Sequence, residues 1–185
     1  MAKSFEIDSD LKVSSASEND LVEVSVLVNS AYRGDSSRAG WTTEADFLDG
    51  QRTDPESLRK HLENPRQTIL CLRNKDESLL GCVSLERTSS HQDLTYYLGM
   101  LTISPTLQSQ GIGRILLEKS EDFVRKLGAK RMILGVIQLR VELISWYERR
   151  GYRKTGETQP FPYNDIRAGI PKRDDLHFIM FEKIL

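Results

Sequence analysis

The sequence predicts a mixed α/β (α+β) fold made of a single domain. Segments with strand character and segments with helical spacing follow one another in the order β-α-α-β-β-β-α-β-α-β-β. The length of 185 residues suits one domain, because domains hold roughly 100–200 residues. Hydrophobic residues make up 38% of the chain and charged residues 29%, which is typical of a globular protein. We expect the core of the domain to span about residues 11–185.

The first half of the chain is expected to contribute one strand and two helices: a strand at 11–17, a helix from Ser17 to about Tyr32, and a helix from Asp54 to about Glu63. Ser17 and Asp54 are good helix caps, and Pro55 suits the first position of a helix. Between the helices, residues 34–53 are polar and contain three glycines. They predict a long loop or a short helix near 44–48, and loops of this length are often functional.

The second half is expected to complete the sheet, with strands at 68–72, 79–85, 94–103, 131–137, 152–158 and 176–183, and with helices at 112–127 and 143–150. Gly99 lies inside the longest of these strands, and a glycine there predicts a bulge or a close approach of two backbones. Residues 159–175 are rich in proline and charge and predict a loop.

Composition argues against several classes of protein. The chain has 26 Lys and Arg against 27 Asp and Glu, so the excess of basic residues that a nucleic-acid binder needs is missing. No apolar run approaches the roughly 20 residues of a membrane span, and the N-terminus lacks the apolar stretch of a secretory signal. Cys71 and Cys82 lack metal-ligand spacing. We therefore expect a cytoplasmic protein with two buried thiols, without metal and without a membrane or nucleic-acid partner.

The balanced total hides a gradient of charge along the chain. Residues 1–66 hold 8 basic and 13 acidic residues, whereas residues 108–154 hold 11 basic and 5 acidic residues. Such an asymmetry often accompanies a charged ligand.

The most informative motif is Gln108-Ser109-Gln110-Gly111-Ile112-Gly113, which follows a strand and opens a helix. The first turn of a helix offers unpaired N–H groups and a partial positive charge, and glycines let the backbone approach a ligand. A phosphate or pyrophosphate is the natural ligand, with Arg114 adding positive charge. No Lys-Ser/Thr follows Gly113, which excludes a Walker loop, and Leu116 stands where a dinucleotide fingerprint needs glycine.

Two further motifs flank this loop. Ile103-Ser104-Pro105 ends the preceding strand, and Tyr147-Glu148-Arg149-Arg150-Gly151-Tyr152 ends the helix after the next strand. Together with the loop they resemble the GNAT superfamily of N-acetyltransferases, whose loop carries Gln/Arg-x-x-Gly-x-Gly/Ala and whose helix carries Tyr-Glu-x-x-Gly-Phe/Tyr. The motifs lie within residues 94–153, about a third of the chain, and the order of elements fits the family over nearly all of it.

The resemblance implies a mixed sheet of six to seven strands that splays between the fourth and the fifth strand, flanked by about four helices. Acetyl-CoA would lie in this gap, as the only cofactor. The implied cofactor-binding residues are Leu101, Thr102, Ile103, Gln108, Ser109, Gln110, Gly111, Ile112, Gly113 and Arg114. Many members carry Asn seven residues before the helix tyrosine; this chain has Arg140 there, which could reach a phosphate or the pantetheine arm.

The resemblance also assigns catalytic roles. Tyr147 matches the tyrosine that protonates the departing thiolate in many members, and a neutral phenol is a suitable donor at pH 7. A backbone amide near Leu101 or Thr102 would polarise the thioester carbonyl. The base that deprotonates the amine is open between Glu86, Glu44 and ordered water.

The amine acceptor is expected to contact the N-terminal half, through the polar loop 34–53 and its neighbour Arg33, and also the loop 159–175. Trp41, Thr42 and Glu44 are the candidate wall, although Trp41 could simply anchor the loop to the core. The acidity of this half favours a cationic amine such as a polyamine, an aminoglycoside or a lysine-like group. Arg33 points the other way, since it could hold the carboxylate of an amino acid.

The function expected from the sequence is therefore acetyl-CoA-dependent N-acetyltransfer to a primary amine of a small molecule, by direct transfer in a ternary complex. One alternative is acetylation of a protein lysine or N-terminus. An alternative of another class is a CoA-binding sensor without turnover. The protein is expected to act as a monomer or a homodimer.

Overall fold

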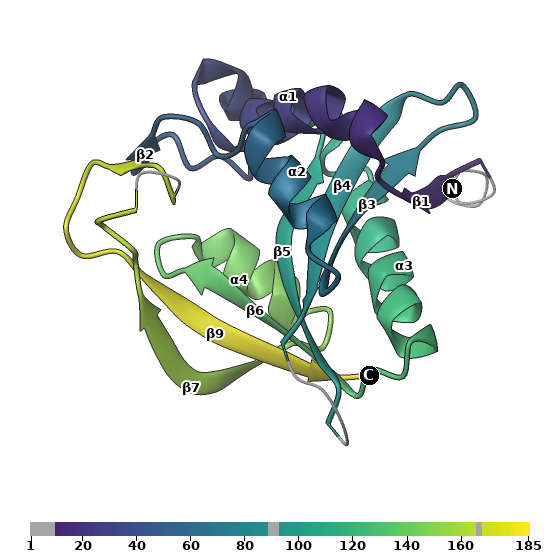
Figure 1. Cartoon of the computed structure of the whole chain (residues 1–185). Helices are drawn as coiled ribbons and strands as arrows, with labels where there is room; N and C mark the ends of the chain where they lie inside the picture. Colours follow the sequence, from purple (N-terminus) through teal and green to yellow (C-terminus); the bar gives the residue numbers. More distant parts are fainter. Residues whose placement is uncertain (1–9, 89–92, 166–167) are drawn as a thin grey trace, which may run out of the picture.

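The computed structural model describes residues 10–88, 93–165 and 168–185. Its centre is a seven-stranded mixed sheet (Figure 1). In spatial order the strands are β1 (Lys12–Ser15), β3 (Gln67–Arg73), β4 (Leu79–Arg87), β5 (Thr95–Ile103), β6 (Arg131–Ile137), β9 (His177–Ile184) and β7 (Arg153–Pro160). The helices are α1 (Leu21–Tyr32), α2 (Pro55–Glu63), α3 (Ile112–Lys126) and α4 (Val141–Glu148). The predicted strands and helices are thus confirmed, with shifts of a few residues at their ends.

Both expected loops contain more structure than the sequence predicts. Residues 34–53 hold a 3-10 helix at Asp35–Ala39 and the strand β2 (Leu48–Asp49) rather than a helix near 44–48. Residues 159–175 hold the strand β8 (Ile170–Pro171), which pairs antiparallel with β2. Two-residue strands are set by their tertiary partner, so no local pattern announces them.

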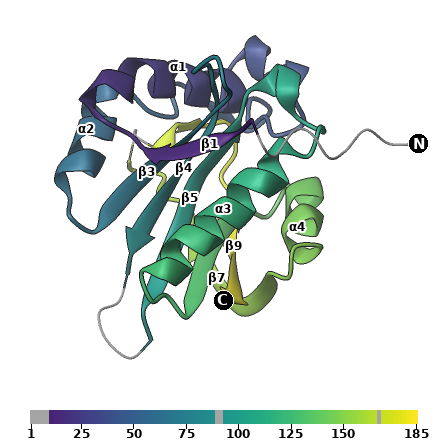
Figure 2. The ribbon, with the colours of Figure 1, turned by 90° about the vertical axis from the view of Figure 1, so that its right-hand side faces the viewer.

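The helices cover the two faces of the sheet (Figure 2). Alternate residues of β3 divide between these layers, because successive side chains of a strand point to opposite faces. Ile69 and Cys71 pack with α1 and α2, whereas Leu70 and Leu72 belong to the cluster that includes α3 and α4. Within the described residues, no helix has both the length and the apolar character needed to cross a membrane.

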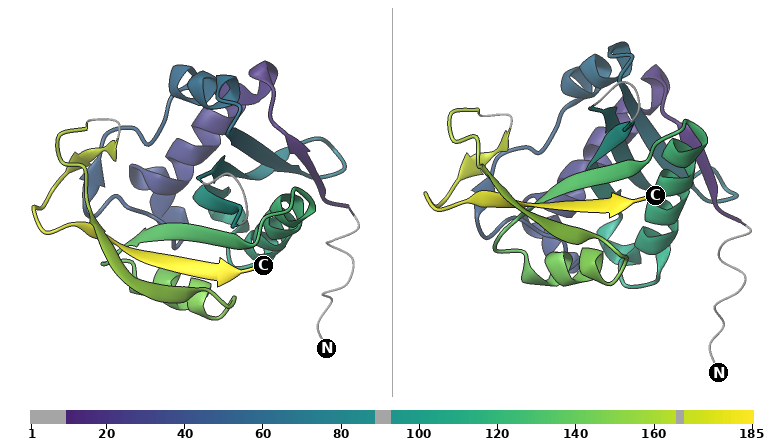
Figure 3. Two further views of the ribbon diagram at one scale, coloured as in Figure 1. Left: turned by 60° about the horizontal axis from the view of Figure 1, so that its bottom comes forward. Right: turned by 90° about the horizontal axis from the view of Figure 1, so that it is seen from below.

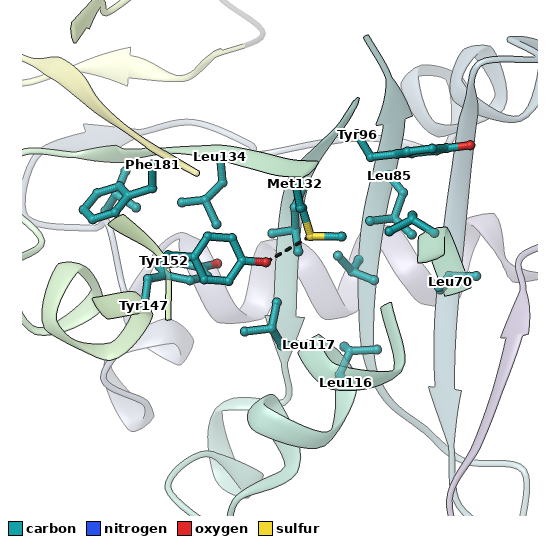
Figure 4. Packing of buried hydrophobic residues seen from close by; sticks show 14 of the residues in the cluster. Leu70, Leu85, Tyr96, Leu116, Leu117, Met132, Leu134, Tyr147, Tyr152 and Phe181 are labelled. Carbon is teal, nitrogen blue, oxygen red and sulfur yellow. Dashed lines mark hydrogen bonds between the residues drawn. The ribbon is translucent and has the colours of Figure 1, made fainter. Parts of the chain in front are cut away.

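The larger cluster packs around Tyr152 (Figure 4). The Tyr152 hydroxyl lies 3.0 Å from the Met132 sulfur and 3.1 Å from Glu121 Oε1. Glu121 is itself buried on α3 and is paired with Lys183 Nζ at 2.6 Å. A buried carboxylate needs such partners, and here they join α3 to β9. The ring of Tyr147 on α4 packs edge-on against the ring of Tyr152.

The sheet opens between its fourth and fifth strands, as predicted. The parallel strands β5 and β6 pair only over Thr95–Tyr97 and Arg131–Ile133, whereas β6 and β9 pair over seven residues. Beyond Tyr97 the two strands separate, and in Figure 3 β6 lies against β9, on the side of the sheet that also carries β7. The separation leaves backbone groups of β5 without a neighbouring strand.

A bulge in β5 lies at the start of this opening. Ser84 pairs with Gly99 but Cys82 pairs with Thr102, so β5 carries an extra residue, and Met100 takes a φ of 52°. The predicted bulge is therefore present, one residue beyond Gly99. The close neighbour of Gly99 is a side chain rather than a backbone, because a Cβ at this position would lie 2.9 Å from Ser84 Oγ.

Candidate active site

The loop before α3 presents its amides to solvent. Ser109 and Gly111 have φ values of 64° and 86°, so the backbone turns through left-handed conformations before the helix begins. In the part of the chain that the structure describes, the amides of residues 109–113 donate to no protein acceptor. Successive free N–H groups at a helix N-terminus form a concave site for an anion.

The side chain of Gln108 is used inside the protein. Its oxygen accepts from the Trp41 backbone N–H at 2.9 Å, and its nitrogen donates to Thr42 Oγ1 at 2.8 Å and to the Ile103 carbonyl at 3.2 Å. Gly40 leaves room for this contact, since a Cβ there would lie 2.5 Å from Gln108 Oε1. Gln108 thus fastens residues 41–42 to the end of β5.

A cavity of about 510 Å³ lies between this loop, the end of β5 and α4. Its wall combines aromatic rings with four guanidinium groups and one carboxylate. The aromatic and charged lining residues are Tyr32, Trp41, Trp146, Tyr147, Arg114, Arg140, Arg149, Arg150 and Glu142. Such a lining suits a ligand that has both an apolar part and several negative charges. Of the residues predicted to hold the cofactor, Leu101, Ile103, Gln108, Ser109, Gly111, Gly113, Arg114 and Arg140 line it.

Arg150 is fixed against the cavity wall by Trp146. Its guanidinium carbon lies 3.7 Å from the centroid of the indole, and Nη1 donates to the Trp146 carbonyl at 2.9 Å. Nε of Arg150 is buried and has no partner among the described residues. Burial and the neighbouring Arg149 lower the pKa of Arg150. An anion in the cavity would relieve both the missing hydrogen bond and the repulsion.

The open edge of β5 offers N–H groups at alternate residues. Ser104 donates to the Leu80 carbonyl at 2.9 Å, so its backbone faces β4, and by alternation Leu101 and Ile103 face the opening. Their carbonyls already accept from Tyr32 Oη at 2.9 Å and from Gln108. Thr102 is buried, and its hydroxyl donates to the Met100 carbonyl. Two of the three predicted residues therefore present amides to the gap.

Tyr147 stands at the inner wall of the cavity, with only 4% of its surface exposed. Its ring packs edge-on against Trp146 and Tyr152, with centroids 5.0 and 5.4 Å apart. Its hydroxyl makes no hydrogen bond within the described residues, although the ring is fixed. Burial raises the pKa of Tyr147 above its ordinary value of 10.0. The phenol stays protonated at neutral pH and is free to donate.

Glu44 lies at the centre of a buried ion-pair network. Arg140 Nη1 contacts Glu44 Oε1 at 2.9 Å, and Arg33 pairs with the other carboxylate oxygen. The three side chains are only 5–9% exposed. Arg140 also donates to the Thr42 carbonyl at 2.6 Å and Arg33 to the Ala168 carbonyl at 3.2 Å. The network therefore joins the ends of α1 and α4 to two loops.

The charges around Glu44 determine its protonation. Burial alone would raise the pKa of this carboxyl, but Arg140 and Arg33 outweigh burial and hold the pKa below the ordinary value. Because both oxygens are occupied and the proton affinity is low, Glu44 is poorly suited to accept a proton from an amine.

The other acids of the loop are paired as well, which overturns the expected acidic wall. Asp46 contacts Arg38 at 2.8 Å, and Asp49 contacts Lys172 at 2.8 Å. Asp35 lies 3.9 Å from Arg38. Each acid of the loop thus has a cation within 4 Å, although Asp35 and Asp46 share Arg38. Trp41 and Thr42 face the cavity beside the glycine loop.

Glu86, the other candidate base, lies on the far side of β4 from α3. Leu85 belongs to the cluster under α3, so the next residue points toward α1 and α2. Glu86 accepts from Gln67 Nε2 at 3.0 Å and is paired in register with Tyr97 of β5. It contributes to the electrostatic environment of His61, whose pKa is lowered chiefly by burial. Unlike Glu44, Glu86 has no basic partner within salt-bridge distance in the described residues.

Several wall residues were missed by the sequence analysis. No sequence motif marks Tyr32, which ends α1. Its place at the site follows only from the hydrogen bond that its hydroxyl donates to the Leu101 carbonyl of β5. The helix motif does not specify the residue types at Trp146, Arg149 and Arg150. Only their closeness to Tyr147 along the chain could have indicated that they line the site. Within the described residues, no group of three His, Cys, Asp or Glu could hold a metal ion.

Comparison with known protein families identifies the family of this chain. Residues 35–152 match the model of the acetyltransferase (GNAT) family, which is more than half of the chain. The chain belongs to the GNAT family of acetyltransferases. The glycine loop, the open strand edge and α4 all lie inside the matched region.

One curated relative and many solved structures resemble this GNAT protein. "Probable N-acetyltransferase 14" of Xenopus tropicalis is 31% identical over 80 residues, which cover 43% of this chain and only 38% of the relative. Spermidine N-acetyltransferase from Vibrio cholerae, solved with CoA and spermine, is 16% identical with a TM-score of 0.69, covering 95% of this chain and 96% of that one. Ribosomal-protein-alanine N-acetyltransferase from Brucella melitensis is 20% identical with a TM-score of 0.68, covering 94% and 99%.

A third structure, yncA from Salmonella typhimurium, holds its cofactor acetyl-CoA. It is 18% identical with a TM-score of 0.67, and 95% of this chain and 94% of that one are covered. At these identities the structural likeness concerns the fold. The spermidine and the ribosomal-protein-alanine N-acetyltransferases are named for a small and a protein acceptor, respectively, so the likeness leaves the acceptor of this chain open.

Proposed function

We propose that this GNAT enzyme transfers the acetyl group of acetyl-CoA to the primary amine of a small molecule, by direct attack within a ternary complex. The observation that carries the proposal is the cavity of about 510 Å³ that runs from the free amides of the glycine loop to the unpartnered hydroxyl of Tyr147. It combines an anion site, an open strand edge and a neutral proton donor.

The residues present fit each part of acetyl-CoA. Amides 109–113 and Arg114 would hold the pyrophosphate, and Arg149 and Arg150 add charge for a further phosphate. Ile103 would donate its N–H group to the pantetheine arm, which would lie beside β5 as an added strand does. Trp41 and Thr42, expected at the acceptor, are proposed instead to bound the cofactor. Bound acetyl-CoA supplies a thioester whose carbonyl carbon is open to attack by an amine.

The protein groups divide the chemistry between them. The Leu101 N–H, which faces the gap, is proposed to polarise the thioester carbonyl as negative charge develops on its oxygen. Tyr147 donates its proton to the sulfur as the carbon–sulfur bond breaks. Glu86 receives the proton of the attacking amine, directly or through water, so that the free electron pair can form the carbon–nitrogen bond. Glu44 is proposed to position Arg140 and residue 42 rather than to act as base.

The pairing of β2 with β8 favours a small acceptor. Lys172 donates to the Ala45 carbonyl at 2.8 Å and pairs with Asp49, and Arg33 holds the Ala168 carbonyl. These contacts tie the segment 168–172 to the polar loop, and Figure 1 shows that segment running beside β2. We propose that it bounds the acceptor side. A bounded site suits a compact amine better than a folded protein surface.

A thiol-release assay tests the proposal. Acetyl-CoA is offered with amino acids, polyamines, aminoglycosides, simple amines and lysine peptides, and free CoA is measured. We expect release that depends on a small amine. Release only with peptides would establish the protein-acceptor alternative. Tight binding of acetyl-CoA without release for any amine would establish a CoA-binding sensor instead.

A further inference from the structure

Arg52 is a positive charge without a counter-ion. Among the described residues its guanidinium forms no hydrogen bond and no ion pair, although it is half-buried. Its backbone is nevertheless held firmly. Asn29 Oδ1 of α1 accepts from the Arg52 N–H at 2.7 Å, and Asn29 Nδ2 donates to the Thr53 carbonyl at 2.8 Å. The side chain thus starts from a fixed point between α1 and α2.

The guanidinium of Arg52 lies beside the point where the strands separate. Its central carbon is 5.6 Å from the centroid of the Tyr32 ring, and the Tyr32 hydroxyl reaches the Leu101 carbonyl at the open edge of β5. Its field also contributes to the pKa of Tyr97 on β5 and of His61 on α2. Arg52 therefore faces the same side of the sheet as Glu86.

The acids that flank Arg52 along the chain are committed to other partners. Glu44 is held by Arg33 and Arg140, and Asp49 pairs with Lys172. Asp54, two residues along the chain, caps α2 by accepting from the Ser57 N–H at 2.8 Å. Arg52 is not itself part of the cavity wall, but its guanidinium lies over the ring of Tyr32, which is. A half-buried guanidinium without a carboxylate partner is suited to take one from a ligand, in a charge-assisted and often bidentate pair.

Resting on the proposed function, we infer that the acceptor carries a carboxylate next to its amine, and that Arg52 binds this carboxylate. The acceptor would then span from Arg52 to Glu86, with its carboxylate on the cation and its amine on the anion. This inference assigns to Arg52 the role that the sequence suggested for Arg33, which is occupied by Glu44. It also disfavours polyamines, because Arg52 would repel them.

Matched acceptors test the inference. Initial rates are measured for amino acids and for their α-amides, which keep the amine and lose the negative charge. The amine of an amide is the weaker base and is more often neutral, so a preference for the acid cannot come from amine reactivity. For the wild-type enzyme we expect kcat/KM to be roughly 10–100-fold higher for the acid, the usual effect of one charge-assisted hydrogen bond.

Variants of Arg52 identify the residue responsible. Arg52→Gln should abolish the preference for acids while leaving KM for acetyl-CoA unchanged, and Arg52→Lys should restore part of it. Arg153→Gln, at an exposed position of β7, is the control and should behave as wild type. Equal or faster reaction of the amides, or an unchanged preference in Arg52→Gln, would overturn the inference while the proposed function stands. Failure of every amine would overturn both.

Discussion

Replacement of Glu44 by glutamine tests the buried network that closes the polar loop onto α4. The substitution keeps the shape of the side chain and removes its charge. Arg33 and Arg140 would then remain 5% and 9% exposed, with like charges facing an amide that can accept from them only weakly. Neither guanidinium can lose its proton, because arginine stays charged in proteins.

The size of the effect follows from the burial of the pair. Removing one partner of a buried ion pair costs about 3–5 kcal/mol, a large part of the roughly 5–15 kcal/mol that holds a typical domain folded. For a chain of this size each kcal/mol corresponds to about 2–4 °C in Tm. We therefore expect Glu44→Gln to lower Tm by roughly 6–20 °C.

Circular dichroism against temperature and against urea measures this loss. Asp46→Asn is the matched control, because it also removes a loop carboxylate from an arginine, at 2.8 Å, but with both side chains at least half exposed. Exposed pairs contribute about 0–1 kcal/mol, so the control should unfold close to the wild-type temperature. If both variants lower Tm by the same small amount, the stabilising role of the buried network is refuted.

The pH dependence of the same comparison has a definite sign. The pKa of Glu44 is held below its ordinary value of 4.5 in the folded protein. Its contribution to stability is therefore complete above that value and is lost as the pH falls through the folded pKa. The difference between wild type and Glu44→Gln should shrink toward zero in acid. A difference that stays constant down to acid pH would contradict the lowered pKa.

Three further outcomes are expected. Tyr147→Phe should lower kcat by roughly 10²–10⁴-fold, with KM for acetyl-CoA nearly unchanged. The control Tyr163→Phe should retain full activity. Equal kcat values for the two variants would show that Tyr147 takes no part in the chemistry. Gln108→Ala removes three hydrogen bonds, each worth about 1 kcal/mol. It should destabilise the protein by roughly 2–4 kcal/mol and raise KM for acetyl-CoA. If residues 34–46 are cleaved by a protease no faster than in the wild type, Gln108 does not hold the loop in place. Burial raises the pKa of Tyr152 above 10.0, so stability should fall as the pH rises above that value, and a Tm that Tyr152→Phe leaves equally sensitive to alkali would contradict this.

The elements that carry the site were predictable because their signals are local. Asp54-Pro55 marks a helix start through capping and a fixed φ, and Asp54 does cap α2. Gly111 adopts a left-handed conformation at the N-cap of α3, which a motif of spaced glycines announces. The alternation of strands and helices predicted the mixed sheet, and the resemblance to the GNAT superfamily predicted its opening between the fourth and fifth strands.

Charge partners were not predictable, because they join residues far apart in the chain. Glu44 meets Arg140 across 96 positions, and Asp49 meets Lys172 through the pairing of β2 with β8. Counting charges by segment therefore suggested an acidic wall that the folded protein neutralises. The same tertiary pairing leaves the Arg52 guanidinium without an acidic partner among the residues that the structure describes, which no sequence pattern could reveal.

Binding of acetyl-CoA is the most direct test of the proposed cofactor site. Isothermal titration compares the wild-type protein with Gly111→Glu and Gly128→Glu. Both glycines have a positive φ, 86° and 92°, and a Cβ at either would touch nothing within 4 Å, so the two variants carry the same strain and the same added charge. Gly111 opens α3 at the cavity, whereas Gly128 lies just beyond its other end. We expect Gly128→Glu to bind like the wild type and Gly111→Glu to bind at least about 100-fold more weakly, since its carboxylate would face the pyrophosphate. Equal affinity of the two variants for acetyl-CoA would contradict the cofactor site at the glycine loop.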